Sequence, residues 1–88
     1  MAHTLISEGL AACVSIVPAV RSIYVFEGKL CDEGEVLCIA KTTAELYPLL
    51  QRRVLELHPY KVPEVIAFAI AAGNPDYLEW VRNSTRNS

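Results

Sequence analysis

Charged residues of one sign form no large cluster in this sequence. Its formal net charge is −2, and it has no basic run. Nucleic-acid-binding domains usually carry a basic patch that neutralises phosphates, so nothing indicates a nucleic-acid partner. No apolar run approaches the roughly 18 residues of a membrane span, and the first residues lack the basic-then-apolar order of a secretion signal. We therefore expect a cytoplasmic protein without a membrane partner.

The common catalytic patterns are also missing. The sequence has no Ser/His/Asp order, no glycine-rich phosphate loop and no paired His-x-x-Glu pattern. It has three cysteines, Cys13, Cys31 and Cys38, with no C-x-x-C spacing, which favours free thiols in a reducing compartment. These absences predict a protein that is not an enzyme.

Size and composition point to an assembly. The 88 residues predict one domain, residues 1–88, whose core is only just sufficient to stabilise it. Apolar residues make up 52% of the chain, above the usual range of about 45–50%. A homo-oligomer is the simplest way to cover the surplus apolar surface.

The stretch over residues 12–42 predicts one long β-hairpin. Two apolar, β-branched runs, Cys13–Phe26 and residues 36–40, flank a polar turn at residues 32–35. Pro18 cannot donate to a strand ladder, so we expect an edge strand with a bend or bulge there. So long an apolar arm cannot be buried within so small a domain, and something outside the chain must cover it.

Helical patterns lie on both sides of the hairpin. Residues 2–12 place apolar side chains at near-helical spacing, with Gly9 as a C-cap. Residues 42–45 have the form of a capping box that opens a helix ending at His58. Pro48, within the second turn, should kink that helix or delay its start.

The last third of the chain predicts a strand and a helix. Residues 65–71 (VIAFAIA) are apolar on both faces, as in a buried strand. Asn74 fits an N-cap, with Pro75 at the first helical position. The expected buried residues of this helix are Tyr77, Leu78 and Val81. The order of elements predicts an α+β fold with helices on one face of an antiparallel sheet.

The segment from His58 to Glu64 (HPYKVPE) carries the strongest chemical signal. The imidazole of His58 could bind a soft or borderline metal, with Glu64 as a supporting carboxylate. The alternative is that His58 complements the helix dipole while the two prolines enforce a turn. Spacing alone favours the alternative, because a metal site needs three or four ligands and His3 lies in a frayed start.

A second group combines charges and aromatic rings. Glu27 and Lys41 lie at the ends of apolar strands, where they either face a cleft or form an ordinary surface ion pair. The aromatic side chains of the group are more often core or interface residues than ligand stackers. The other members are Tyr24, Asp76, Tyr77 and Trp80.

Four motifs in order resemble the CutA family of divalent-cation tolerance proteins, over residues 10–81. They are LAACVSIVPAVRSIYVFEGKL, the Lys-Thr-Thr step at residues 41–43, LHPYKVPEVIA and GNPDYLEW. The resemblance implies a ferredoxin-like fold, a homotrimer built from the hairpins, a cytoplasmic or organellar location, and an association with copper and other divalent cations.

The resemblance also implies roles for particular residues. His58 matches the histidine of the family's His-Pro-Tyr motif, which is implicated in copper binding. Seven residues match positions that line a cleft between subunits: Tyr24, Glu27, Lys41, Tyr60, Glu64, Asp76 and Trp80.

The sequence departs from the family at its beginning. Family members begin with a β-strand that precedes the first helix, whereas this chain begins partway through that helix. The strand would lie between residues 36–40 and residues 65–71, so we expect an N-terminally incomplete domain that also lacks a possible cysteine ligand.

Three functions remain open at this point. The first is a trimeric, non-enzymatic copper or divalent-cation tolerance protein with His58 in its site. The second is a signalling module like the PII regulators, which bind small molecules between subunits. The third is a purely structural trimer.

Overall fold

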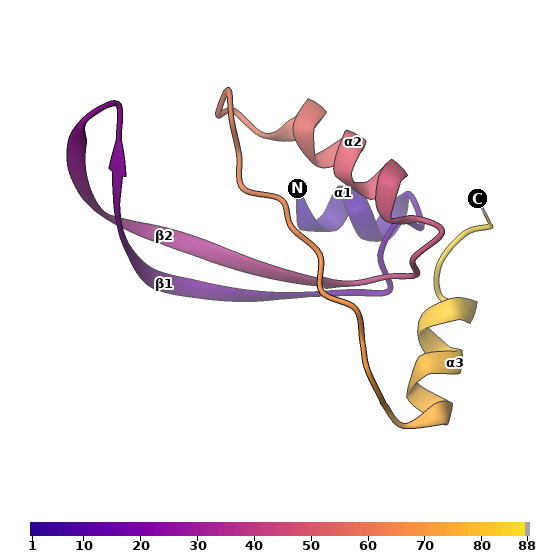
Figure 1. Ribbon diagram of the computed structural model, residues 1–88. Helices are drawn as coiled ribbons and strands as arrows, with labels where there is room; N and C mark the ends of the chain where they lie inside the picture. The colour runs from indigo at the N-terminus through magenta and orange to yellow at the C-terminus, as the bar shows by residue number, and fades with distance from the viewer. Residues whose placement is uncertain (88) are drawn as a thin grey trace.

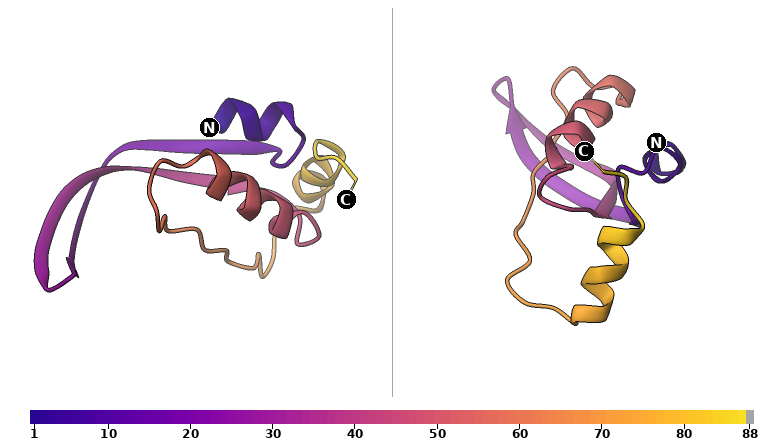
Figure 2. Two further views of the ribbon diagram at one scale, coloured as in Figure 1. Left: turned by 90° about the horizontal axis from the view of Figure 1, so that it is seen from above. Right: turned by 90° about the vertical axis from the view of Figure 1, so that its right-hand side faces the viewer.

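A long hairpin with helices around its base makes up the computed structural model, which describes residues 1–87 (Figure 1). Helices α1 and α2 lie over the same face of the straight part of the hairpin, and α3 lies beyond its base (Figures 1 and 2). The elements are α1 (Ala2–Ser7), β1 (Cys13–Phe26), β2 (Lys29–Lys41), α2 (Tyr47–Leu57) and α3 (Pro75–Asn83).

The hairpin turn is formed by Glu27 and Gly28, so its predicted position at residues 32–35 was wrong. Both turn residues have positive φ, 51° and 78°. This backbone matches the right-handed twist of the two strands, and glycine adopts it without strain. Gly34 instead lies within β2, opposite Arg21. The strand predicted as residues 36–40 is therefore much longer, Lys29–Lys41.

A β-bulge bends the hairpin at Pro18, as predicted. Val17 pairs with Leu37 and Val20 with Glu35, so two residues of β1 lie opposite one residue of β2. A bulge of this kind leaves one residue without a ladder partner and increases the local twist. Proline is tolerated there because it has no N–H to donate. Beyond the bulge both strands curve towards the side of the sheet on which α1 and α2 lie (Figure 1).

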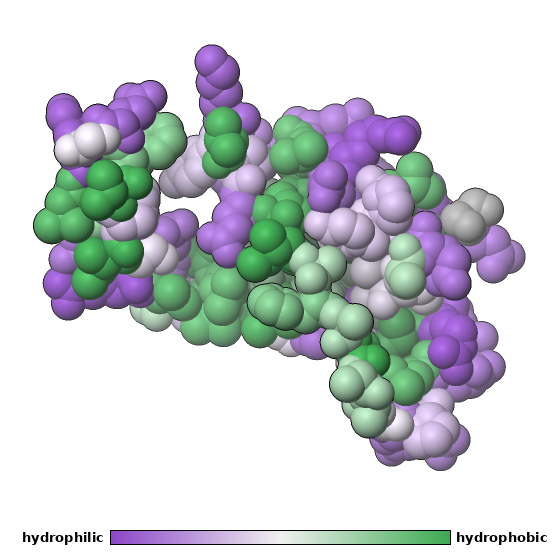
Figure 3. All heavy atoms as spheres, in the orientation of Figure 1, coloured by the Kyte–Doolittle hydropathy of each residue, from purple (hydrophilic) through white to green (hydrophobic). Residues whose placement is uncertain are grey.

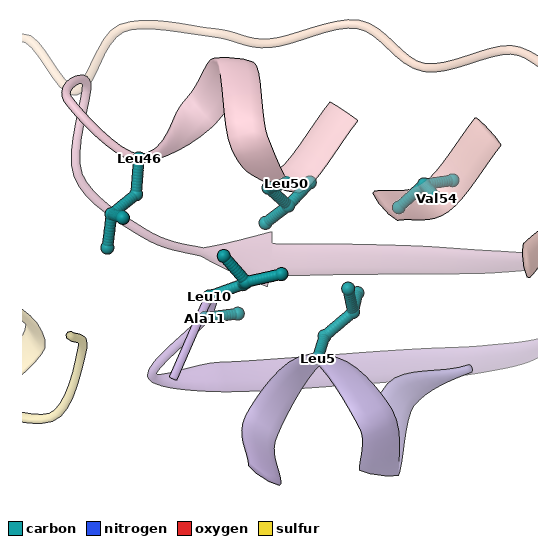
Figure 4. Close-up of a cluster of buried hydrophobic side chains, with 6 residues drawn as sticks. All are labelled: Leu5, Leu10, Ala11, Leu46, Leu50 and Val54. Atoms are coloured by element: carbon teal, nitrogen blue, oxygen red, sulfur yellow. The ribbon is translucent and has the colours of Figure 1, made fainter. Parts of the chain in front are cut away.

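The core is small and lies at the base of the hairpin (Figure 4). Val14 of β1 and Ala40 of β2 pack against it from the sheet. The buried cluster contains residues of α1, α2 and the loops between elements: Leu5, Leu10, Ala11, Leu46, Leu50 and Val54.

The end of α1 is held by a glycine cap, as predicted. Gly9 has φ of 72°. The N–H of Leu10 donates to the carbonyl of Leu5 (2.9 Å) and the N–H of Gly9 to that of Ile6 (3.0 Å). These two bonds form a Schellman motif, which turns the chain so that Leu10 enters the core. The N–H of Arg86 donates to the carbonyl of Gly9 (2.8 Å), which joins the C-terminal segment to this turn.

Helix α2 begins at Tyr47, after the capping box at residues 42–45, which confirms the delayed start predicted from Pro48. The carbonyl of Thr43 accepts hydrogen bonds from the N–H groups of Leu46 and Tyr47, so residues 43–46 form a separate turn. Pro48 delays the start of the helix because it fits the first turn, where its missing N–H has no partner to lose.

Helix α3 begins as predicted. The side chain of Asn74 accepts from the N–H of Asp76 (3.0 Å), and Pro75 occupies the first turn. Val81 is buried, whereas Tyr77 is exposed, so the expectation that Tyr77 is buried was wrong. It lies instead against Trp80 on the outer face of the helix, with ring centroids 5.8 Å apart.

Residues 65–71 do not form the predicted strand. The segment carries no strand assignment, and β1 and β2 form the only sheet among residues 1–87. A strand needs a neighbour to which its backbone groups can bond, and this segment has none. Val65 packs against the core, but Phe68 is 86% exposed.

The core position of Leu50 can be tested against a matched leucine of the same helix. Leu50 is 5% exposed and Leu55 is 48% exposed. We expect Leu50→Ala to lower the free energy of unfolding by about 2–5 kcal/mol, because it leaves a cavity. Leu55→Ala should change it by less than about 0.5 kcal/mol. Urea denaturation measures both, and equal losses would contradict the placement of the core.

Candidate functional site

A hollow of about 840 Å³ lies between the bent part of the hairpin and the segment that follows α2. It is open to one side, and a notch is visible there between the hairpin tip and the rest of the molecule (Figure 3). Residues 18–21 of β1, Asp32 and residues 34–36 of β2, and residues 58–60 line it. The bulge at Pro18 creates this hollow, because it turns the outer hairpin back towards the end of α2.

His58 is positioned by the end of α2 and by the turn that follows. It is the C-cap residue, and its N–H donates to the carbonyl of Val54 (2.8 Å). Its Nδ1 accepts from the N–H of Tyr60 (3.1 Å), and the two rings meet edge to face with centroids 4.7 Å apart. An Nδ1 that accepts a hydrogen bond carries no proton, so the neutral ring has its proton on Nε2.

An ion pair that sequence reasoning missed lies on the hairpin side of the hollow. The Nε and Nη2 atoms of Arg21 donate to the two carboxylate oxygens of Asp32 at 2.7 and 2.6 Å. This two-point contact raises the pKa of Arg21 and lowers the pKa of Asp32 below its ordinary value of 3.8. The pair is diagonal across the strands, so a correct position for the turn would have revealed it.

Of the eight residues predicted for a site, the structure brings two to the hollow, His58 and Tyr60. Tyr24 lies beyond the bulge, opposite Cys31, and burial together with nearby Glu33 raises the pKa of its phenol. Glu64 is exposed on the segment after α2. The remaining four lie at the hairpin turn, at the hairpin base and on α3: Glu27, Lys41, Asp76 and Trp80.

Glu27 and Lys41 cannot meet within one chain. Glu27 lies in the turn, whereas Lys41 pairs with Cys13 at the opposite end of the hairpin. The separation along the strand is roughly 45 Å, at about 3.3 Å per residue over about 14 residues. The alternative of an ordinary ion pair between these two residues was therefore wrong for a single chain.

Lys41 makes its own cluster at the base of the hairpin. Its Nζ donates to the hydroxyl of Ser15, lies 3.8 Å from the sulfur of Cys13, and lies 3.4 Å from the carbonyl oxygen of Ile39. Cys13 and Ser15 are two residues apart on β1 and therefore point to the same face of the sheet. This cluster was not predicted from the sequence, because the erroneous turn gave the wrong cross-strand partners.

The fit of this chain to a copper or other divalent cation is partial. The imidazole of His58 is a suitable ligand for such a metal. Within residues 1–87, however, no three His, Cys, Asp or Glu side chains are gathered closely enough to hold an ion. One chain thus offers one nitrogen ligand at the hollow, fewer than the three or four that a stable site uses.

The sequence matches a known family along nearly its whole length. A family model described as CutA1 divalent ion tolerance protein matches residues 1–84. The divalent-cation tolerance protein CutA of Thermus thermophilus is 48% identical over 97% of this chain and 82% of its own length. The chloroplastic protein CutA 1 of Oryza sativa is 51% identical over 100% of this chain and 50% of its own length, so this chain spans half of that relative.

Solved structures give the same result. The crystal structure of CutA1 from Oryza sativa matches with a TM-score of 0.95 and 52% identity, over 99% of this chain and 80% of that one. A structure titled PII-like protein CutA from Nostoc, in apo form, matches with a TM-score of 0.91 and 33% identity, over 97% and 83%. The α+β, ferredoxin-like fold class predicted from the sequence is confirmed by these likenesses.

No helix within the described residues is both long and apolar enough to cross a membrane. The longest helix in the described part of the chain, α2, has 11 residues.

The Arg21–Asp32 pair predicts a pH dependence of stability. Because the pKa of Asp32 is lowered in the folded chain, its contribution is fully present above the ordinary carboxylate pKa of 3.8. It is lost as the pH falls through the lower, folded value. We therefore expect Asp32→Asn to lower the urea midpoint at roughly pH 7, and this difference to close by roughly pH 2.

A second variant isolates the pair. In an Arg21→Met background, Asp32→Asn should have almost no further effect at neutral pH. A difference between the parent chain and Asp32→Asn that persists undiminished at low pH would contradict the assignment.

Proposed function

Because the chain belongs to the CutA1 family of divalent ion tolerance proteins, we propose that it acts as a non-enzymatic, homotrimeric protein of divalent-cation tolerance. The observation that carries the proposal is the hairpin beyond the bulge. It projects past the core, and within residues 1–87 no other element covers its large apolar side chains (Figure 3). Its exposed apolar side chains include Ile23, Val25, Phe26 and Leu30.

Exposure on this scale favours self-assembly. Val25 and Leu30 are cross-strand partners, and they are 68% and 75% exposed. A long apolar strand with free backbone groups would pair with other chains unless a specific partner covers it. Other copies of the same chain are present wherever the protein is made, so they can serve as this partner. That the copies number three follows from the resemblance and not from the shape of one chain.

We further propose that copper(II) binds at His58 in the assembled protein. The support is the position of His58 in the lining of an open hollow. Assembly would add the ligands that one chain lacks. Binding through Nε2 requires the ring proton to move to Nδ1, and the hydrogen bond from the N–H of Tyr60 must then be released.

The two alternatives have less support. The Nostoc structure bears the name PII-like, but this chain has no glycine-rich or basic loop for a phosphate. A purely structural trimer would leave the half-buried His58 without a ligand, and its ring would only stabilise the turn.

A cytoplasmic location is proposed on the state of the cysteines. All three are free in the structure, as expected for a reducing compartment. Cell fractionation with immunoblotting tests this, and recovery in an oxidising compartment would contradict it.

The assembly can be tested by placing a charge on the hairpin tip. We expect light scattering to give the mass of three chains for the parent protein and a smaller mass for Val25→Lys. The buried ammonium would have no partner in the interface. Leu55→Lys is the control, because it adds the same charge to an exposed position of α2 and should leave the mass unchanged. A parent protein that stays monomeric at high concentration would refute the proposal.

The copper proposal can be tested with the two histidines of the chain. We expect His58→Ala to weaken copper(II) binding by at least about tenfold, since it removes a ligand. Both proteins carry His3→Ala, because a histidine at position 3 of a free amino terminus chelates copper(II) on its own. Calorimetric titration of the assembled protein measures both. Equal affinity for the parent and His58→Ala would exclude His58 as a ligand.

A further inference from the structure

The hairpin base brings a thiol and a primary amine into contact. Cys13 of β1 and Lys41 of β2 are direct cross-strand partners, and the sulfur lies 3.8 Å from Nζ. Lys41 takes part in none of the ion pairs found within residues 1–87, so no carboxylate holds the amine away from the sulfur. Both residues are half-buried, which limits their motion but leaves room for a small oxidant.

Cys13 differs in this respect from the other two cysteines. The thiol of Cys31 donates to the backbone carbonyl of Lys29 at 3.7 Å. Cys38 is exposed and lies opposite Ile16. Of the three thiols, all within the described residues, that of Cys13 is the one in contact with a side-chain amine.

We infer that Cys13 and Lys41 form a reversible sulfenamide cross-link when the protein meets a peroxide. Hydrogen peroxide first oxidises the thiol of Cys13 to a sulfenic acid and is reduced to water. The unprotonated amine of Lys41 then attacks that sulfur. The S–N bond forms, the S–O bond breaks, and the hydroxyl leaves as water with a proton from the nitrogen. One thiol, one amine and one peroxide thus give one sulfenamide and two waters.

The cross-link changes both the strands and the charge. It joins the first residue of β1 to the last residue of β2, where the hairpin meets the core. It also removes the positive charge of Lys41, one of the residues for which a role in a cleft was predicted. A dithiol reductant restores the thiol and the amine. The cross-link is therefore a reversible modification that forms in response to peroxide.

The experiment uses the full chain with Cys31→Ser and Cys38→Ser, so that Cys13 is its only thiol. After treatment with hydrogen peroxide, mass spectrometry should show the loss of two hydrogens, restored by dithiothreitol. Trypsin cannot cleave at a cross-linked Lys41. We therefore expect residues 1–21 to be recovered joined to residues 30–52, which contain that uncleaved lysine.

Lys41→Arg in the same background is the matched variant, because it keeps the positive charge without a nucleophilic amine. In this variant the sulfenic acid should persist, and its labelling by dimedone should rise several-fold over that of the Lys41 protein. The inference is overturned if Lys41 remains cleavable after oxidation while Cys13 proceeds to sulfinic and sulfonic acids. Equal dimedone labelling of the two proteins would overturn it as well. Circular dichroism of both proteins confirms that they are folded.

Discussion

The pairing of β1 with β2 is the constraint on which the rest of the structure depends. The two strands are 14 and 13 residues long, far more than the roughly five or six of an ordinary strand. A chain of 88 residues can cover only part of such a hairpin. Two short helices and a few loop residues cover its base, and the outer part lies beyond their reach.

The bulge at Pro18 divides the hairpin into these two parts. On the inner side, Val14 and Ala40 pack under the core, and the ion pair between Glu8 of the α1 end and Arg53 of α2 joins the two helices. On the outer side, the strands turn towards the end of α2 and enclose the hollow. One proline thus separates the part that packs against the core of its own chain from the part for which we propose a partner.

The sequence predicted features that depend on local chemistry. Pro18 marked the bulge, Gly9 the cap of α1, and Asn74 the start of α3, because each has a conformational or hydrogen-bonding property that few other residues share. The turn was misplaced because residues 32–35 are more polar than Glu27-Gly28, whereas a two-residue hairpin depends on backbone angles and not on polarity.

Features that depend on distant partners could not be predicted in the same way. Residues 65–71 have the composition of a strand, but composition does not supply a neighbouring strand to pair with. The candidate site was subject to the same limit. Resemblance predicted seven residues for a cleft between subunits and His58 for a metal, and of these eight one chain brings only His58 and Tyr60 to its hollow. The contact between Arg53 and Glu8 likewise joins residues 45 positions apart, with no local pattern to reveal it.

The dispersed positions of the predicted site residues are themselves an argument about assembly. Glu27 lies at the tip of the hairpin and Lys41 at its base, so a cleft that contains both must combine the tip of one copy with the base of another. A tip that is apolar and uncovered, and a base with a half-buried amine, are compatible with that arrangement. The length of the hairpin, which leaves the single chain incompletely covered, then also determines where a shared site can form. The residues of such a shared site would come together only once the copies have assembled.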